Sequence, residues 1–546
     1  MTIYSRYVLS YFRQRDRGWI LSLFAAVSMV YLPFLGNPFV FDDIPFFLND
    51  AASSFATADF YFSTRWLPYA SLGWTYAIFS DVLTHIYHLG NMLLHAATVI
   101  ALFYLLRQLM VAVIPDSKNL PQMIWGAWLA AIIFAVHPVA VYAVGYIIQR
   151  SILMTTLFVL LMQLAYLRGL LTGQWRWLLL AVLAYILAGL SKEHSLLAPA
   201  LLVAETILLR GQIMASARSL WLTWGALAAV GVKIMLLAKG VFGVPYEIMA
   251  TNLFAQQGLV ESTPMLHALS VLTQAGLFFK YLWLWLLPNP AWMSIDMREP
   301  FVATMAAWQS WLGAAGFVVY GVLGGWLLFR PRWAGLFGLA LLYPWLLFPI
   351  EFSSIRVQEP FVLYRSYLWM PGIMLLFPLF LAQLPGRKPL LVLGLVALLL
   401  VLPAWNRLWV FADNYRLWND AALLLNDGQA AGADRIFYNR GKEEAASQKW
   451  SEAKADYKRA VGINPTYAPY HYALGTAYFD FKLYNEALAQ FDECIVLKKD
   501  EARYYFAKGV TLKHLHEDVQ ALRQIEKSCE LDYVVACLII KNIRNK

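Results

Sequence analysis

Charged side chains are scarce in this sequence. Asp, Glu, Lys and Arg make up 14% of the 546 residues, whereas they make up about 25% of a typical soluble protein. Apolar residues account for 60% of the chain, and its mean hydropathy is +0.54. These values exclude a string of soluble domains along most of the chain, and they predict an integral membrane protein with many spans.

The few charges are unevenly distributed. Residues 412–546 contain 19 acidic and 19 basic residues, whereas the longer segment 1–411 contains 15 and 24. The first segment therefore carries the whole net charge of +9, and the second has the composition of a soluble domain. An excess of Lys and Arg in a membrane domain is typical of cytoplasmic loops, so no nucleic-acid partner is expected.

Cysteine is also rare. The three cysteines, Cys494, Cys529 and Cys537, all lie in the soluble part, without a CxxC pair or a Cys/His cluster. A structural zinc site is therefore not expected. Cys529 and Cys537 either form a disulfide, which an oxidising compartment permits, or remain two buried thiols.

Apolar runs near the length of about 20 residues that a span needs predict eleven membrane crossings. They lie at roughly 18–36, 86–106, 122–137, 151–168, 176–191, 194–210, 219–238, 307–329, 333–350, 361–383 and 389–410. Four arginines in the first 17 residues indicate a cytoplasmic N-terminus, so an odd number of crossings puts the C-terminal part outside. The run at 267–287 is interpreted as a re-entrant or interfacial outer helix, because a full crossing would move the basic loops near 330 and 387 outward.

The soluble part contains an internal repeat with a period of 34 residues. Small and bulky residues recur together at Gly441, Gly475 and Gly509, at Ala453, Ala487 and Ala521, and at Tyr457, Phe491 and Ile525. This spacing is typical of tetratricopeptide repeats, in which two helices cross at the small residues. Three repeats and a terminal capping helix are predicted, and Cys494 is interpreted as a packing residue of the second repeat.

Two adjacent carboxylates, Asp42 and Asp43, follow the first predicted span at the outer surface. Charges beside a membrane domain are costly, at about 2.5 to 3.5 kcal/mol each at a helix centre. A carboxylate in this place can act as a general base toward a hydroxyl or bind a metal. The alternative is a pair that caps the short helix after it.

Other polar residues fall on the same predicted membrane face. They are Arg65, His85, His88, Asn91, His95, His137, Gln149, Arg150, Lys192, Glu193, His194, Tyr364 and Arg365. The cations Arg150, Lys192 and Arg365 can bind an anionic group such as a lipid phosphate, or they are interfacial cations whose side chains snorkel. The helical face of 88, 91 and 95 fits a zinc site or, more commonly, hydrogen bonds between helices.

Five segments carry a family resemblance. They are FVFDD at 39–43, HLGNMLLH at 88–95, FAVHPVAVYAVGYIIQR at 134–150, LSKEHSLLAP at 190–199 and YRSYLWMPG at 364–372. Together with the repeats, they resemble the GT-C superfamily of polytopic glycosyltransferases, above all the transmembrane-and-tetratricopeptide protein O-mannosyltransferases and the bacterial pilin-type protein O-glycosyltransferases.

The resemblance implies a set of roles. Asp42 or Asp43 would be the catalytic base, and a sugar on a polyprenyl phosphate would be the donor. Arg150, Lys192 and Arg365 would hold the donor phosphate. Further site candidates are Arg65, His88, His137, Glu193, His194 and Tyr364. A divalent metal is left open, and no other cofactor is expected.

The expected fold is all-α. A GT-C-like bundle of about eleven spans covers residues 1–411, with outer loops at 37–84, 239–306 and 351–363. A linker at 412–434 and a repeat solenoid at 435–546 follow.

The expected protein lies in the cytoplasmic (inner) membrane, with its active site and repeats on the periplasmic side. It is expected to transfer a sugar to a hydroxyl of a secreted or surface protein, such as a pilin-like subunit, with inversion. Membrane lipid, the lipid-linked sugar and this protein acceptor are the expected partners. Two alternatives stay open: a transferase acting on lipopolysaccharide or another glycolipid, and a non-catalytic scaffold that presents the repeats.

Overall fold

The structure is a computed structural model that describes residues 16–79, 83–115, 118–238, 244, 263–357, 359–384, 386, 388–428 and 430–544. Three of the four N-terminal arginines, Arg387 and most of 239–262 lie outside these ranges. Every regular element within them is a helix, with one isolated β-bridge between Met297 and Phe361. The all-helical expectation is therefore confirmed for the described residues.

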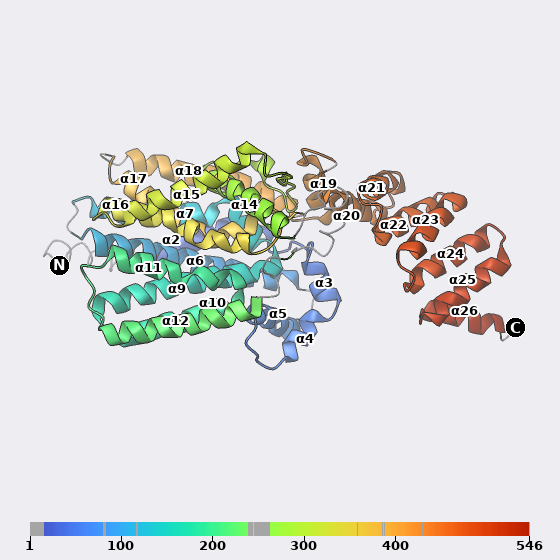
Figure 1. Ribbon diagram of the computed structural model, residues 1–546, viewed down its shortest axis with the longest axis horizontal. Coiled ribbons are helices and arrows are strands. Elements are labelled where there is room, and N and C mark those ends of the chain that lie inside the picture. The colour runs from blue at the N-terminus through green and yellow to red at the C-terminus, as the bar shows by residue number, and fades with distance from the viewer. Residues whose placement is uncertain are drawn as a thin grey trace.

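The helices form two parts that follow each other along the long axis of the molecule (Figure 1). The N-terminal part is an apolar bundle, and the C-terminal part is a curved array of helix pairs at its far end. The bundle contains α2 (Asp16–Tyr31), α6 (Thr84–Val113), α7 (Leu120–Val136), α9 (Arg150–Thr172), α10 (Trp175–Ser191), α11 (Pro199–Leu208), α12 (Ala217–Ala238), α14 (Thr263–Leu286), α15 (Trp308–Leu328), α16 (Trp333–Leu347), α17 (Leu376–Leu381) and α18 (Lys388–Val410).

Eight of the described helices are long and apolar enough to cross a membrane, or nine if α7 and the bent segment Pro138–Val144 form one span. The expected count of eleven is not confirmed. Two of the expected runs form helices of only 17 and 10 residues, α10 and α11. The run at 361–383 is divided into two 3-10 segments and α17, because Pro371 and Pro378 remove backbone donors and clash with the preceding turn.

Helix α14, which covers the ambiguous run, is 24 residues long and passes the same test of length and composition. Its contacts lie at the end of the bundle that faces the repeats. His267 Nε2 is 2.6 Å from the Phe352 carbonyl, Gln274 donates to the Pro360 carbonyl, and Trp285 donates to Ser366 Oγ. The helix is therefore bonded along its whole length to the segment 352–366, and its interfacial placement stays a prediction.

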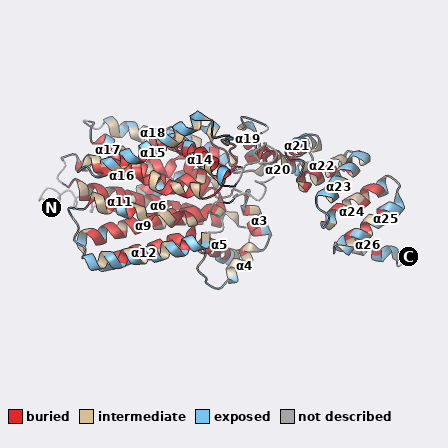
Figure 2. Cartoon of the chain, in the orientation of Figure 1, coloured by how far each residue is buried: buried red, intermediate tan, exposed pale blue. Residues whose placement is uncertain are grey.

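The outer helices α12, α15 and α18 have long exposed faces (Figure 2), and many of the exposed residues are large and apolar. Only 17, 22 and 17% of their most apolar windows are buried. Trp221 is 79% exposed, Val322 66% and Leu391 72%. Soluble monomers rarely expose contiguous apolar surfaces of this extent, so these faces require an apolar environment.

The C-terminal array confirms the predicted repeat packing. Its pairs are α20 (Ala433–Ala446) with α21 (Trp450–Ile463), α22 (Ala468–Asp480) with α23 (Tyr484–Leu497), and α24 (Ala502–His514) with α25 (Asp518–Glu530), followed by α26 (Val534–Arg544). A Cβ added at Gly475 would lie 2.7 Å from the Phe491 ring, and Gly441 and Gly509 meet Tyr457 and Ile525 in the same way. The 34-residue period therefore reflects the close approach of the two helices in each pair.

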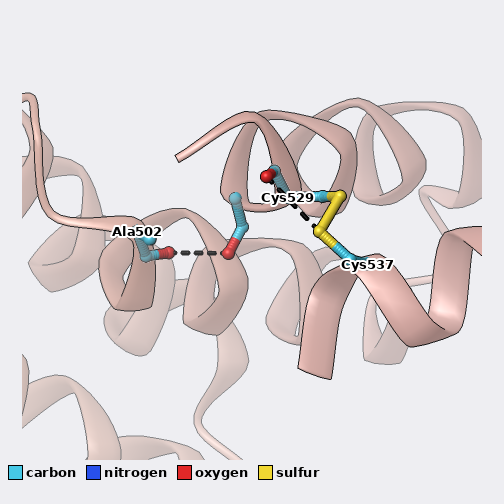
Figure 3. The surroundings of a disulfide bond; sticks show 4 residues. Ala502, Cys529 and Cys537 are labelled. Atoms are coloured by element: carbon cyan, nitrogen blue, oxygen red, sulfur yellow. Dashed lines mark hydrogen bonds between the residues drawn. A yellow bond between two sulfur atoms is a disulfide. The ribbon is translucent and has the colours of Figure 1, made fainter. Parts of the chain in front are cut away.

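The last helix is covalently attached to the array. Cys529 of α25 and Cys537 of α26 form a disulfide, and the neighbouring Ser528 donates to the Ala502 carbonyl of α24 at 2.8 Å (Figure 3). Of the two alternatives for this pair, the structure contains the disulfide. Closing so short a loop stabilises the fold by about 2.5 kcal/mol in the chain-entropy account. Cys494 is a buried free thiol, as expected for a packing residue.

Candidate active site

A polar pocket of about 160 Å³ lies at the end of the bundle that faces the repeats. Segments far apart in the sequence form its wall. The lining residues are Asp42, Arg65, Tyr69, Ile148, Gln149, Ser151, Lys192, His194, Arg356, Glu359, Tyr364 and Arg365. Six of the predicted site residues thus meet in one place: Asp42, Arg65, Lys192, His194, Tyr364 and Arg365.

Asp42 is the carboxylate of the acidic pair that faces this pocket. It is the residue before α3 (Asp43–Leu48), and its backbone N–H donates to the Tyr146 hydroxyl at 3.0 Å. Phe41 before it has a φ of 49°, a left-handed conformation that costs a non-glycine residue energy and often occurs at functional sites. Burial raises the pKa of Asp42, whereas a hydrogen bond to Tyr146 and the charges of Arg435 and Arg65 act in the opposite direction. A carboxylate with a raised pKa is a stronger base when it is ionised.

Asp43 has a different environment. It is completely buried, and its oxygens accept hydrogen bonds from the backbone N–H groups of Val40, Ile147 and Ile148 at 3.3, 3.3 and 2.7 Å. Burial raises its pKa to about 8, against the effect of these donors. Asp43 does not line the pocket, and it joins the loop before α3 to the loop before α9.

Lys192 is a buried cation in the pocket wall. It lies between α10 and the 3-10 segment Glu193–Leu197. Its ammonium donates to Gln149 Oε1 at 3.1 Å and lies 4.9 Å from the centre of the Tyr364 ring. No carboxylate among the described residues forms an ion pair with it. Burial, reinforced by the charges of Arg65 and Arg365, lowers its pKa to about 7. An incoming anion would supply the negative charge that no carboxylate provides for this ammonium.

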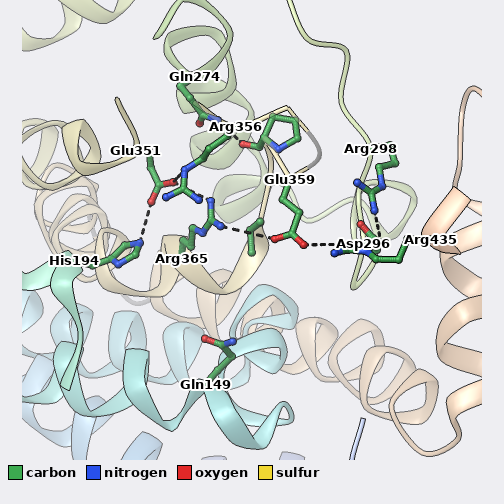
Figure 4. Close-up of polar contacts among 12 residues, drawn as sticks. Gln149, His194, Gln274, Asp296, Arg298, Glu351, Arg356, Glu359, Arg365 and Arg435 are labelled. Carbon is green, nitrogen blue, oxygen red and sulfur yellow. Dashed lines mark hydrogen bonds and ion pairs between the residues drawn. The ribbon is translucent and has the colours of Figure 1, made fainter. Parts of the chain in front are cut away.

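The arginines of the pocket are held by carboxylates (Figure 4). Glu351 lies 3.0 Å from Arg365, 3.2 Å from Arg356 and 3.2 Å from His194. Arg65 forms an ion pair of 2.6 Å with Glu193, and the φ of Arg65 is 69°. The ion pair with Arg65 is the main reason why the pKa of Glu193 is well below its usual range, although burial opposes it. These pairs fix the guanidinium groups before any ligand enters.

The first repeat helix takes part in the site. Arg435 of α20 lies 2.7 Å from Glu359 of the pocket wall and 2.9 Å from Asp296, and its guanidinium is 5.0 Å from the Phe41 ring. In Figure 4 these side chains connect the repeat array to the loop 351–363. Arg435 and Arg365 counteract burial and hold the pKa of Glu359 at about 2. The first repeat helix is therefore in contact with Phe41, the residue before Asp42, and with Glu359 of the pocket wall.

Other predicted site residues lie outside the pocket. Arg150 is buried at the start of α9, where it donates to Asn91 Oδ1 at 2.9 Å and to the Tyr87 carbonyl at 3.0 Å. His88 bonds the Asn37 carbonyl at 3.0 Å. His137 accepts from the Val139 N–H, and its ring stacks on Trp285 at 4.4 Å. None of these three residues lines the pocket, and the donor-phosphate role of Arg150 stays a prediction.

The polar face of α6 binds other helices. Asn91 donates to the carbonyls of Val144 and Ile147, and His95 contacts the Tyr367 hydroxyl at 2.6 Å. In the described part of the chain, no group of three or more His, Cys, Asp or Glu side chains is placed to hold a metal ion. The two interpretations of this face are a zinc site and hydrogen bonds between helices, and the structure shows the hydrogen bonds.

Sequence reasoning missed several residues of the site. Arg356, Glu359 and Glu351 lie in a segment that was expected only as an outer loop, and Arg435 lies in the repeat array. The one available signal was the presence of four charges within residues 351–365 of a chain poor in charge. Their partners come from distant segments, so no local pattern identifies them.

Comparisons with known proteins match part of the chain. The TPR repeat family matches residues 436–480. Over 114 residues, the chain is 30% identical to the UDP-N-acetylglucosamine–peptide N-acetylglucosaminyltransferase of Giardia intestinalis, a match that covers 20% of this chain and 8% of the relative. The chain thus spans less than a tenth of that relative's length.

Solved structures are similar at low identity. The Arabidopsis OM64 TPR domain is 17% identical, with a TM-score of 0.20, over 21% of this chain and 95% of that one. A crystal structure of MamA is 19% identical, with a TM-score of 0.20, over 27% of this chain and 78% of that one. The family match and the relative from Giardia show that the chain contains TPR repeats and is distantly similar, over a fifth of its length, to a protein glycosyltransferase.

Proposed function

We propose that the protein is a membrane glycosyltransferase that moves a sugar from a polyprenyl phosphate to a hydroxyl of a protein. One observation carries the proposal: a carboxylate with a raised pKa, Asp42, and a buried ammonium without a carboxylate partner, Lys192, line the same small pocket. The pocket lies in the apolar bundle, and its wall residue Glu359 pairs with Arg435 of the first repeat. A lipid-linked donor and a protein acceptor would meet in this pocket.

The placement in a membrane rests on the surface of the bundle. Helices α12, α15 and α18 expose large apolar side chains along their length, and lipid is the environment that such faces fit. The Cys529–Cys537 disulfide favours an oxidising compartment for the repeats. We therefore place the repeats and the pocket on the periplasmic side and the N-terminus in the cytoplasm.

The chemistry needs one base and one stabilised leaving group. Ionised Asp42 takes the proton of the acceptor hydroxyl, while the oxygen of that hydroxyl attacks the anomeric carbon of the donor sugar. The bond between that carbon and the phosphate oxygen breaks, and the polyprenyl phosphate leaves with one more negative charge. Lys192, together with Arg365, stabilises this charge. Attack from the face opposite the phosphate inverts the configuration.

A protein is the acceptor that the repeats favour. TPR arrays stack helix pairs into a concave surface that binds other chains, and the relative from Giardia is named as an enzyme that modifies peptides. Arg435 connects the first repeat to the pocket wall. A polypeptide bound along the array, such as a pilin-like subunit, would then present its hydroxyl close to Asp42.

Intact-mass spectrometry of surface and secreted proteins tests the proposal whichever sugar is transferred. Cells that lack the protein are complemented with the wild type, with Asp42→Asn or with Asp59→Asn, a control in an exposed position of the same loop. We expect a sugar-sized mass on at least one protein with the wild type and the control, and its loss with Asp42→Asn. A sugar lost from a glycolipid instead would identify a glycolipid as the acceptor. No change in either the proteins or the glycolipids would contradict sugar transfer.

A further inference from the structure

A second, much larger cavity lies in the side of the bundle, and it extends along α10 from Trp177 to Leu187. It has a volume of about 1000 Å³ and is formed by α6, α9 and α10. Its wall is mostly apolar, and it includes Leu161, Leu180 and Leu183, which are 39, 46 and 46% exposed. The cavity is thus an open groove in the side of the bundle, and the proposed transfer reaction does not use it.

One end of the groove carries polar groups. Arg107 of α6 and Arg168 of α9 line it near the C-terminal ends of their helices. These helix ends lie at the end of the bundle away from the repeats (Figure 1). Arg107 forms an ion pair with Asp16 at 2.6 Å. Arg168 lies 4.1 Å from the centre of the Trp177 ring, and no carboxylate in the described residues pairs with it. The groove therefore combines an apolar wall with an arginine that is available to an anion.

The length of the groove matches one leaflet of a bilayer. On α9 it extends from Phe158 to Leu171, which corresponds to roughly 20 Å at 1.5 Å per residue. Half of the hydrocarbon core measures about 15 Å. An acyl chain that lies along the leucines would therefore place its headgroup near Arg168.

We propose that this groove binds an anionic glycerophospholipid, with its acyl chains against the leucines and its headgroup phosphate on Arg168. The adjacent Trp177 is at the position where aromatic side chains meet lipid headgroups. The inference rests on the membrane placement proposed above and does not depend on sugar transfer. The site is separate from the polar pocket, because the two cavities share no lining residue.

Native mass spectrometry of the detergent-solubilised full chain tests this site. The chain is titrated with dioleoyl phosphatidylglycerol and, separately, with dioleoyl phosphatidylcholine. We expect tighter binding of phosphatidylglycerol, and a loss of roughly tenfold in its affinity with Arg168→Gln, the usual effect of removing one charge-assisted bond to phosphate. The control is Arg330→Gln, because Arg330 also stacks on a tryptophan, Trp326, at 4.6 Å but does not line the groove.

A pair of groove variants tests the apolar wall independently. Leu183→Trp fills the groove, whereas Leu179→Trp changes an equally exposed leucine of α10 outside it. Weaker lipid binding with Leu183→Trp alone supports the site. Equal binding of the two lipids, or equal effects of the matched variants, would overturn it. A chain that fails to float with liposomes would contradict the membrane placement, and loss of sugar transfer would not affect this result.

Discussion

Asp42 and Asp43 show how two neighbouring carboxylates acquire different roles from their surroundings. Asp42 faces the pocket next to charged groups, whereas Asp43 is buried and accepts three backbone N–H bonds. The sequence alone left open which of them is the base. Because only Asp42 of the two lines the pocket, we propose that Asp42 is the base and that Asp43 has a structural role, holding the loop before α3 against the loop before α9.

This assignment predicts different effects of the two Asn substitutions on stability. Asp43→Asn places an amide N–H₂ group against backbone N–H donors, and unsatisfied buried donors cost about 1–3 kcal/mol each. We therefore expect a lower midpoint of thermal unfolding for Asp43→Asn and an unchanged midpoint for Asp42→Asn. Unfolding of the purified full chain, followed by tryptophan fluorescence, measures both. Equal midpoints would contradict a structural role for Asp43.

Lys192 predicts the pH dependence of transfer. Its pKa of about 7, caused by burial and by Arg65 and Arg365, means that the ammonium is charged below pH 7 and loses its charge above it. Only the charged form can stabilise a phosphate, so the rate at low donor concentration should fall above pH 7, by up to about tenfold per pH unit. Lys192→Arg should remove this decrease, because arginine stays charged. A decrease that persists unchanged in Lys192→Arg would contradict the role.

The scarcity of charge made part of the site predictable at the level of single residues. Asp42, Lys192 and Arg365 were selected because ionisable groups near a membrane are costly and few, and all three line the pocket. Arg150 satisfied the same criterion but bonds Asn91 and a backbone carbonyl inside the bundle. Sequence position does not reveal which way a side chain points from a helix end, so this distinction required the structure.

At the scale of elements, the contact between α20 and the bundle is the feature that the sequence did not indicate. Arg435 bridges Asp296 and Glu359 across the two parts, and α19 (Asn414–Leu423), within the segment expected as a linker, packs Trp418 against Phe41 at 5.3 Å. The repeat period was predictable because it is encoded at fixed spacing. Contacts between an array and a distant loop have no such spacing.

The bridge predicts a specific effect of Arg435→Gln. Truncating one partner of such an interface pair costs about 2–5 kcal/mol, so the array should detach locally from the pocket wall. We expect faster hydrogen exchange in α19 and in residues 359–365, together with slower transfer. The matched control is Arg459→Gln on the neighbouring helix α21, where Arg459 is exposed and, among the charged groups of the described residues, pairs only with Asp456 at 3.8 Å. Unchanged exchange in Arg435→Gln would show that the bridge does not hold the two parts together.

At the scale of the whole molecule, composition predicted the division into an apolar bundle and a soluble repeat array. The number of crossings was not predictable in the same way. Hydropathy treats an apolar run as one helix, whereas prolines divide the run at 361–383. The two parts lie end to end (Figure 1), and the polar pocket is connected to the repeat array through the ion pair between Glu359 and Arg435.

The central claim is that Asp42 drives sugar transfer from a lipid phosphate in this pocket. The most direct measurement combines the purified full chain with lipid-linked sugars and acceptor proteins extracted from cells that lack it, and follows both pools by mass spectrometry. The account predicts that the wild type and Asp59→Asn convert sugar-carrying lipid phosphate into free lipid phosphate and glycosylated protein in equal amounts, while folded Asp42→Asn does not. Conversion by Asp42→Asn at the wild-type rate, or glycosylated protein without consumption of the lipid-linked sugar, would contradict it.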